Sequence, residues 1–263
     1  MTILIIVSVV LLTGGLTFLF SERIKAKHRM FSTFSAALVA SLIFVHILPD
    51  IYGSEVGAKW LGLAVLLGLV IQLVLEKITH GIEHGHHHTH AKSHKSILIG
   101  VMLGLGAHAL IEGMPISIDD DHQTEETEEH AHIHNDHHDH EHVDYSSGKT
   151  KVSSKFISAI LMHKVPVTLM LSLFLLSIGV KPVNYFLLLL IFAVMTPLGM
   201  FTGEFLMKIP AINSYKFYLL AVSTGMLLHI ITSILFEHGH SKKETNLHIL
   251  LIVLGVSIGV ILF

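Results

Sequence analysis

Eight apolar runs, each close to the length that crosses a lipid bilayer, constrain the fold of this 263-residue chain more than any other feature. A transmembrane helix needs about 20 mainly apolar residues. Only 14% of the chain is charged, whereas soluble domains carry about 25%. The pattern predicts an all-α integral membrane protein with eight transmembrane helices in a single domain over residues 1–263. The expected spans are 2–21, 30–50, 59–79, 97–118, 155–180, 183–207, 215–236 and 246–263.

Two polar insertions, at 80–96 and 119–154, interrupt the spans, and both are rich in histidine. Residues 80–94 contain seven histidines with little acid, whereas residues 119–144 contain eight histidines among eleven carboxylates. Neutral imidazoles bind zinc, so we expect both insertions to collect cations as auxiliary loops that are dispensable for the main activity. The candidate auxiliary ligands are His84, His86, His87, His88, His90, His132, His134, His137 and His138.

Lysine and arginine residues in the short loops indicate the orientation. With the N-terminus outside, the cytoplasmic loops hold ten of these residues and the outside loops hold six. Cytoplasmic loops are enriched in positive charge, so we expect both termini outside, the 80–96 loop in the cytoplasm and the 119–154 loop outside. The expected location is a plasma membrane, which is the inner membrane if the cell is bacterial.

Two of the expected spans carry ionisable residues within apolar sequence: His108 and Glu112 in the fourth span, and His163 and Lys164 in the fifth. A charged residue at the bilayer centre costs about 2.5–3.5 kcal/mol on insertion scales, so each is expected to have a partner. Residues i and i+4 share one face of a helix, which places His108 beside Glu112. If the two helices pack together, His108, Glu112 and His163 offer three metal ligands and leave a fourth position for exchange. The alternative is that each histidine satisfies a separate buried hydrogen bond.

A proline follows each of these groups, Pro115 in the fourth span and Pro166 in the fifth. Proline lacks an N–H group and clashes with the carbonyl four residues before it. Both helices are therefore predicted to be kinked, which is tolerated at membrane depth where the backbone lines a cavity.

The chain has no cysteine, so any metal must be held by nitrogen and oxygen ligands. Such ligands suit zinc and its divalent neighbours cadmium, iron and manganese, and they disfavour copper(I). No G-x-x-x-x-G-K-[ST] sequence occurs, which argues against direct use of ATP through a P-loop. We expect a transporter of a divalent cation, with zinc the leading candidate, rather than an enzyme. The cation is then cargo, with no resident cofactor and no nucleic-acid partner; the expected partners are the lipid bilayer and, if the chain assembles, a second copy in a homodimer.

The sequence His108-Ala-Leu-Ile-Glu112-Gly113 in a fourth span, with His163-Lys164-Val-Pro166 in a fifth, resembles the Zrt/Irt-like (ZIP) metal transporter family. A His-rich stretch between the third and fourth spans is also similar to that family, as are Thr196-Pro-Leu-Gly199 and Gly225-Met-Leu-Leu-His229 in the sixth and seventh spans. The resemblance implies a ZIP-like helix bundle that imports divalent cations, most commonly zinc, toward the cytoplasm by alternating access. It also implies a metal centre between the fourth and fifth helices, whose first site falls on His108, Glu112 and His163.

The second metal site of the resembled family is not matched. Ala109 stands where the family has asparagine, Lys164 and Val167 stand where it has ligands, and Thr196 stands where some relatives have an acid. The chain is therefore expected to be a single-metal variant in which Lys164 replaces the charge of the second ion.

Other polar residues at depth are secondary candidates. His46 and Asp50, at the outer end of the second span, predict either an entry site or a solvated helix end. Glu204 and His229 are candidates for the lining of the ion pathway. Gln72 is expected to form a hydrogen bond between helices.

Lys164 admits three interpretations: a pair with Glu112 or Glu204, a substitute for a second cation, or a side chain that extends to the membrane surface without a role. Glu76, near the cytoplasmic end of the third span, is a candidate for helping the cation leave.

Two further functions fit parts of the pattern. A zinc held by His108, His163 and His229 would activate water for intramembrane hydrolysis, with Glu112 as the general base. A metal exporter or sensor would use the same ligand types, and growth under excess zinc or chelation separates export from import.

Overall fold

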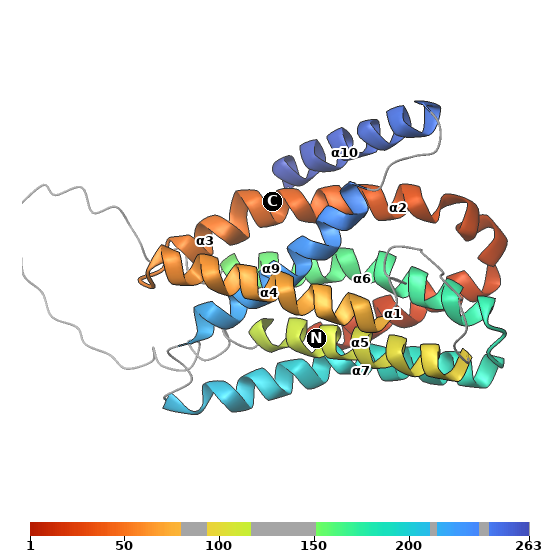
Figure 1. The fold of residues 1–263 in the computed structure, drawn as a ribbon, viewed down its shortest axis with the longest axis horizontal. Coiled ribbons are helices and arrows are strands. Elements are labelled where there is room, and N and C mark those ends of the chain that lie inside the picture. Colours follow the sequence, from red (N-terminus) through yellow and green to blue (C-terminus); the bar gives the residue numbers. More distant parts are fainter. Residues whose placement is uncertain (80–93, 117–150, 211–214, 237–241, 263) are drawn as a thin grey trace, which may run out of the picture.

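The computed structural model describes residues 1–79, 94–116, 151–210, 215–236 and 242–262. Within these residues the chain is helical, with no strand (Figure 1). The elements are α1 (Thr2–Leu19), α2 (Ser21–Leu42), the π-helical turn η1 (Ile43–Ile47), α3 (Leu48–Tyr52), α4 (Ala58–Thr79), α5 (His94–Gly113), α6 (Lys151–Ser177), α7 (Pro182–Met207), α9 (Lys216–Leu235) and α10 (Lys242–Leu262).

Eight of the described helical segments are long and apolar enough to cross a membrane, which confirms the predicted multi-pass, all-α architecture. α2, η1 and α3 run together as one of these segments, Lys27–Tyr52. The other seven segments are Thr2–Leu19, Ala58–Ile78, Ile97–Ile116, Phe156–Ser177, Pro182–Met207, Lys216–Leu235 and Thr245–Leu262.

The helices that follow the two insertions begin a few residues before the candidate spans do. α5 begins at His94 and α6 begins at Lys151, so residues 94–96 and 151–154 are helical, whereas the candidate spans begin at Ile97 and Phe156. The other residues of the two insertions fall in 80–93 and 117–150, and all nine candidate auxiliary histidines therefore lie outside the described residues.

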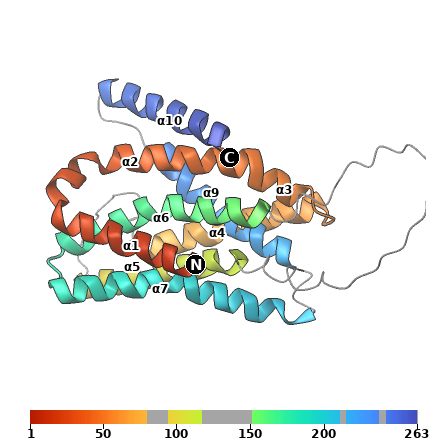
Figure 2. The same ribbon diagram turned by 180° about the vertical axis from the view of Figure 1, so that it is seen from behind.

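The helices pack into two apolar cores that share α6. One core is formed by α2, η1, α3, α4, α9 and the first part of α6, together with Ile6 of α1 and Ile116. The other core is formed by Val10 of α1, by α5 and α7, and by the last part of α6. Phe156 and Ile160 belong to the first core and Val167 and Leu171 to the second, so His163 lies where α6 passes between them. Figures 1 and 2 show α4 running beside α9, and α10 lying against α2 at the edge of the bundle.

Glycine permits α4 and α9 to approach each other closely. A Cβ atom on Gly68 would collide with the carbonyl oxygen of Val222, and one on Gly225 would collide with the carbonyl oxygen of Val65. Small residues let membrane helices approach backbone to backbone. α4 also packs against the ligand-bearing helix α5, where a Cβ atom on Gly100 would collide with the carbonyl oxygen of Ile78.

Candidate metal centre

The three predicted ligands come together on α5 and α6. The Nε2 atom of His108 lies 3.3 Å from Oε2 of Glu112, and Nε2 of His163 lies 3.4 Å from the same oxygen. The ligand atoms of all three residues lie within 4.8 Å of one another, and at most 3% of any of these side chains is exposed. His108 and Glu112 share a face of α5 because they are one helical turn apart, and His163 faces them from α6.

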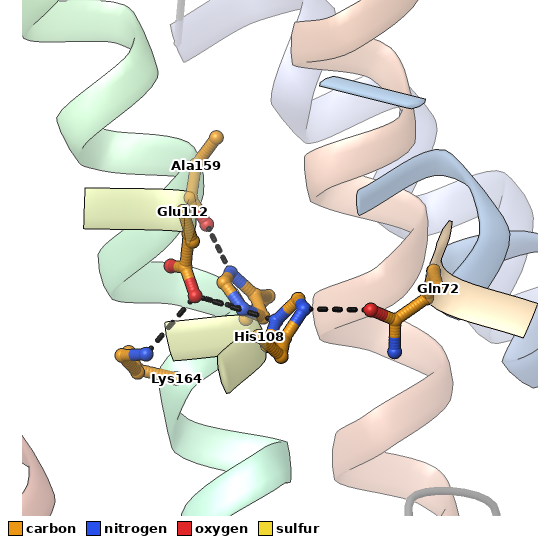
Figure 3. Close-up of polar contacts among 6 residues, drawn as sticks. Gln72, His108, Glu112, Ala159 and Lys164 are labelled. Atoms are coloured by element: carbon orange, nitrogen blue, oxygen red, sulfur yellow. Dashed lines mark hydrogen bonds and ion pairs between the residues drawn. The ribbon is translucent and has the colours of Figure 1, made fainter. Parts of the chain in front are cut away.

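Hydrogen bonds at the far side of each imidazole determine which nitrogen is available. Nδ1 of His108 lies 2.8 Å from Oε1 of Gln72, and Nδ1 of His163 lies 3.3 Å from the carbonyl oxygen of Ala159 (Figure 3). Both partner oxygens are acceptors, so each Nδ1 carries a proton and donates it. In a neutral imidazole the other nitrogen then has a lone pair, and in both histidines that nitrogen points at Glu112.

The spacing of the ligand atoms suits a tetrahedral zinc ion. Tetrahedral Zn–N and Zn–O bonds of about 2.0–2.2 Å place a nitrogen and an oxygen ligand about 3.3–3.5 Å apart, and both imidazole–carboxylate separations in this group fall within that range. Nε2 of His108, Nε2 of His163 and Oε1 of Glu112 form no hydrogen bond within the described structure. Lone pairs that converge in a buried site repel one another, and a cation placed between them removes that repulsion. The group can therefore bind a metal ion.

Lys164 pairs with Glu112, one of the two carboxylates considered from the sequence. Its Nζ atom lies 3.0 Å from Oε2 of Glu112 and 5.0 Å from the ring centroid of Phe192. The lysine side chain is fully buried, so the interpretation of a lysine that extends to the membrane surface was wrong. The group contains one fixed positive charge beside its carboxylate.

Glu204, the other carboxylate considered as a partner of Lys164, lies outside the group of three ligands. It lies near the end of α7, where its Oε1 atom pairs with Nζ of Lys208 at 2.9 Å, and about half of its side chain is exposed. The structure does not bring Glu204 together with the three ligands.

Glycine also explains why α7 lies directly behind the site. A Cβ atom on Gly113 would collide with the carbonyl oxygen of Thr196, and one on Gly199 would collide with the carbonyl oxygen of Leu110. Gly113 follows Glu112 in the sequence, so the ligand helix and α7 touch beside the carboxylate. The Thr-Pro-Leu-Gly sequence noted in the sixth span supplies the other side of this contact.

The two prolines occupy different positions in their helices. The α-helix α5 ends at Gly113, and Pro115 lies in the 3₁₀ turn that follows it. Pro166 lies inside α6, which continues past it to Ser177. The kinks expected in these two helices stay a prediction.

Pro166 leaves a carbonyl without its helical donor, and another helix supplies one. The N–H that would bond to the carbonyl of Met162 belongs to residue 166, where proline has none. The hydroxyl of Ser35 in α2 donates to that carbonyl at 2.6 Å. This bond ties α2 to α6 one residue before His163. The sequence prediction missed Ser35, although the position of Pro166 identified the freed carbonyl.

His229 forms a separate pair with Glu76. Its Nε2 atom lies 2.6 Å from Oε2 of Glu76, which joins α9 to α4, and both side chains are partly buried. The group of three ligands in the described residues does not include His229. The three histidines considered for a hydrolase, His108, His163 and His229, therefore do not form one group of ligands in the described structure.

His46 and Asp50 lie at an irregular part of the second span. Proline at position 49 lacks the N–H that would continue the α-helical bonding, and the turn η1 before it is π-helical, with the N–H of Leu48 bonded to the carbonyl of Ile43. π-turns often occur at functional sites. His46 is half-buried within η1, Asp50 is exposed in α3, and neither belongs to the group of three ligands.

No protein-family model matches this chain, and no curated protein matches it in sequence.

Proposed function

We propose that this protein transports a divalent cation, with zinc the leading cargo, through a single site formed by His108, Glu112 and His163 between the fourth and fifth spans. One observation carries the proposal: two imidazole lone pairs and a carboxylate, held on two adjacent spans, lie within 4.8 Å of one another, and each imidazole nitrogen is at the distance from the carboxylate oxygen that tetrahedral zinc ligands have. These ligand types also accept cadmium, iron(II) and manganese.

The number of ligands favours passage of the ion over permanent binding. Structural zinc sites have four protein ligands, whereas three ligands leave a position for water or an exchanging group. Lys164 adds a positive charge 3.0 Å from the carboxylate oxygen that the cation would use. The repulsion lowers the affinity of the site and so helps the ion to leave.

The proposal includes the orientation of the chain in the membrane and the direction of transport. We place both termini outside a plasma membrane and the flux toward the cytoplasm, as in a ZIP-like importer with Lys164 in the place of a second ion. The buried position of the ligands requires a conformational change for exchange with either side, since at most 3% of each side chain is exposed. Alternating access provides such a change.

Uptake of radioactive zinc by proteoliposomes tests the proposal. The wild type is expected to accumulate zinc, and His108→Ala and Glu112→Gln are expected to reduce uptake to the level of empty liposomes. Matched controls are His28→Ala and Glu22→Gln, which change the same residue types near the start of α2 and are expected to retain uptake. Absence of uptake by the wild type, or undiminished uptake by the Glu112 variant, would exclude the proposal.

The direction of flux is tested in cells. Expression of an importer sensitises cells to excess zinc and restores growth under chelation, whereas an exporter does the reverse. The reverse result would keep the metal site but would replace import with export.

A further inference from the structure

Gln72 contacts the metal group from a helix that carries no ligand. It lies in α4, its side chain is fully buried, and its Oε1 atom is 2.8 Å from Nδ1 of His108. Figure 3 shows the amide on the opposite side of the imidazole from Glu112. The ring of His108 therefore lies between an acceptor on α4 and the carboxylate on its own helix.

The amide oxygen decides where the proton of a neutral His108 ring resides. While Gln72 accepts from Nδ1, Nε2 has its lone pair directed at the space shared with Glu112 and His163. Without an acceptor at Nδ1, the ring gains a hydrogen bond by moving its proton to Nε2, which lies 3.3 Å from Oε2 of Glu112. That bond would be charge-assisted and therefore strong, and it would turn a metal ligand into a donor that blocks the site.

We propose that Gln72 is a positioning residue that holds His108 in its Nδ1–H tautomer and thereby keeps Nε2 available to the cation. A hydrogen-bond partner behind a histidine ligand orients the ring and fixes its tautomer. The inferred tautomer rests on the contact between Nδ1 of His108 and Oε1 of Gln72, and its effect on transport rests on the proposed function.

The position of Gln72 on α4 links the affinity of the site to the packing of two helices. α4 lies tightly against α9 through Gly68 and Gly225, whereas α5 lies against α7 through Gly113 and Gly199. A displacement between α4 and α5 separates the amide from the imidazole. Such a displacement therefore lowers the affinity of His108 for the cation, although His108 and Glu112 keep their positions on α5.

The first test reads the tautomer directly in metal-free protein. Solid-state NMR of isotope-labelled imidazole nitrogens distinguishes a protonated Nδ1 from a protonated Nε2, and the His108 signals are those that His108→Gln removes. We expect the Nδ1–H form in the wild type, the Nε2–H form in Gln72→Met and the Nδ1–H form in Gln72→Glu, which retains an acceptor. Tyr185→Phe, which removes a buried hydroxyl that donates to the carbonyl of Gly14, is the control and is expected to leave the signals unchanged.

The second test reads the consequence in zinc uptake. Loss of the partner behind a metal-bound histidine weakens affinity about 10- to 100-fold, so Gln72→Met is expected to raise the KM for zinc by about that factor. Gln72→Glu is expected to restore a KM within a few-fold of the wild type. A purely structural role would instead lower the amount of folded protein and leave KM unchanged.

The outcomes separate this inference from the proposed function. An Nε2–H tautomer in the wild type, or an unchanged tautomer in Gln72→Met, overturns the role of Gln72 whether or not zinc is transported. If the expected tautomers are found in a protein that transports no zinc, the role of Gln72 is supported and only the proposed function is overturned. Normal wild-type uptake with an unchanged KM in Gln72→Met overturns the predicted link to affinity.

Discussion

The ammonium group of Lys164 on α6 lies 3.0 Å from carboxylate oxygen Oε2 of Glu112 on α5, and both side chains are almost completely buried. Removing one residue of a buried ion pair leaves the other buried charge without compensation. The free energy of unfolding then falls by more than it does when one residue of an exposed pair is removed. Lys164 therefore stabilises the metal-free protein, and under the proposed function it would compete with the cation for Glu112.

Lys164→Met is expected to lower the free energy of unfolding of metal-free protein by about 3–5 kcal/mol, because Glu112 then has no cation beside it. Lys208→Met is the matched control, since Lys208 pairs with Glu204 at the surface, where exposed pairs contribute about 0–1 kcal/mol. Unfolding in a denaturing detergent, monitored by circular dichroism, measures both variants. Zinc is expected to stabilise Lys164→Met more than the wild type, because the ion replaces the lost charge. Equal loss of stability in the two variants would contradict the compensating role of Lys164.

Ser35→Ala is expected to lower the free energy of unfolding by about 1 kcal/mol, because the carbonyl of Met162 loses the hydroxyl that replaces the missing N–H of Pro166. In a Pro166→Ala background residue 166 has an N–H that can bond to that carbonyl, so the cost of Ser35→Ala should fall. A double-mutant cycle in detergent measures the difference. If Ser35→Ala costs the same with and without Pro166, its effect does not act through the freed carbonyl.

Hydropathy was sufficient to predict the eight spans, because a bilayer imposes the same length and composition on each helix separately. The grouping of His108 and Glu112 was equally local, since residues four apart share a helix face. His163 joined them because a polar side chain at depth needs partners, and few candidates exist in so apolar a chain.

Contacts between side chains of different helices were harder to predict from the sequence. Ser35 and Met162 are separated by 127 positions, and no local pattern specifies how far α2 and α6 slide past each other. Consecutive helical residues point about 100° apart, yet His163 and Lys164 both reach Glu112, because the lysine side chain is long and flexible. Glu204 pairs with Lys208, the residue that follows the end of its own helix, rather than with a residue of α6.

Gly113→Ala is expected to move α5 away from α7, because the added methyl group would collide with the backbone of Thr196 and lie 3.2 Å from the Cα atom of Gly199. Overpacking of this kind costs about 1–3 kcal/mol, and the shift is expected to raise the KM for zinc because Glu112 is the preceding residue. Gly106→Ala is the control on the same helix, since the added methyl group would lie 3.7 Å from the side chain of Met195, an ordinary van der Waals contact. A KM that is unchanged in Gly113→Ala would show that the carboxylate is positioned independently of α7.

The pair of His229 and Glu76 joins α9 to α4 outside the metal group, and it allows a structural role to be separated from a role in the ion pathway. Glu76→Gln and His229→Gln each remove the charge-assisted bond while retaining similar volume. If the pair fastens the two helices, the double variant should be less destabilised than the sum of the single variants, by about 0.5–3 kcal/mol of coupling. The cycle is measured by unfolding in detergent, and Thr224→Val, which removes a bond to the carbonyl of Leu220 within α9, is the control for a loss confined to one helix.

Zinc uptake by the same variants tests the pathway. Because the metal ligands are unchanged, a purely structural pair leaves the KM for zinc as in the wild type once uptake is corrected for the amount of folded protein. A pair that also receives the cation lowers the maximal rate in both single variants, since either substitution removes one of its two ligand atoms. Additive stabilities together with a wild-type maximal rate would contradict both roles, and the short His229–Glu76 contact would then have no measurable consequence.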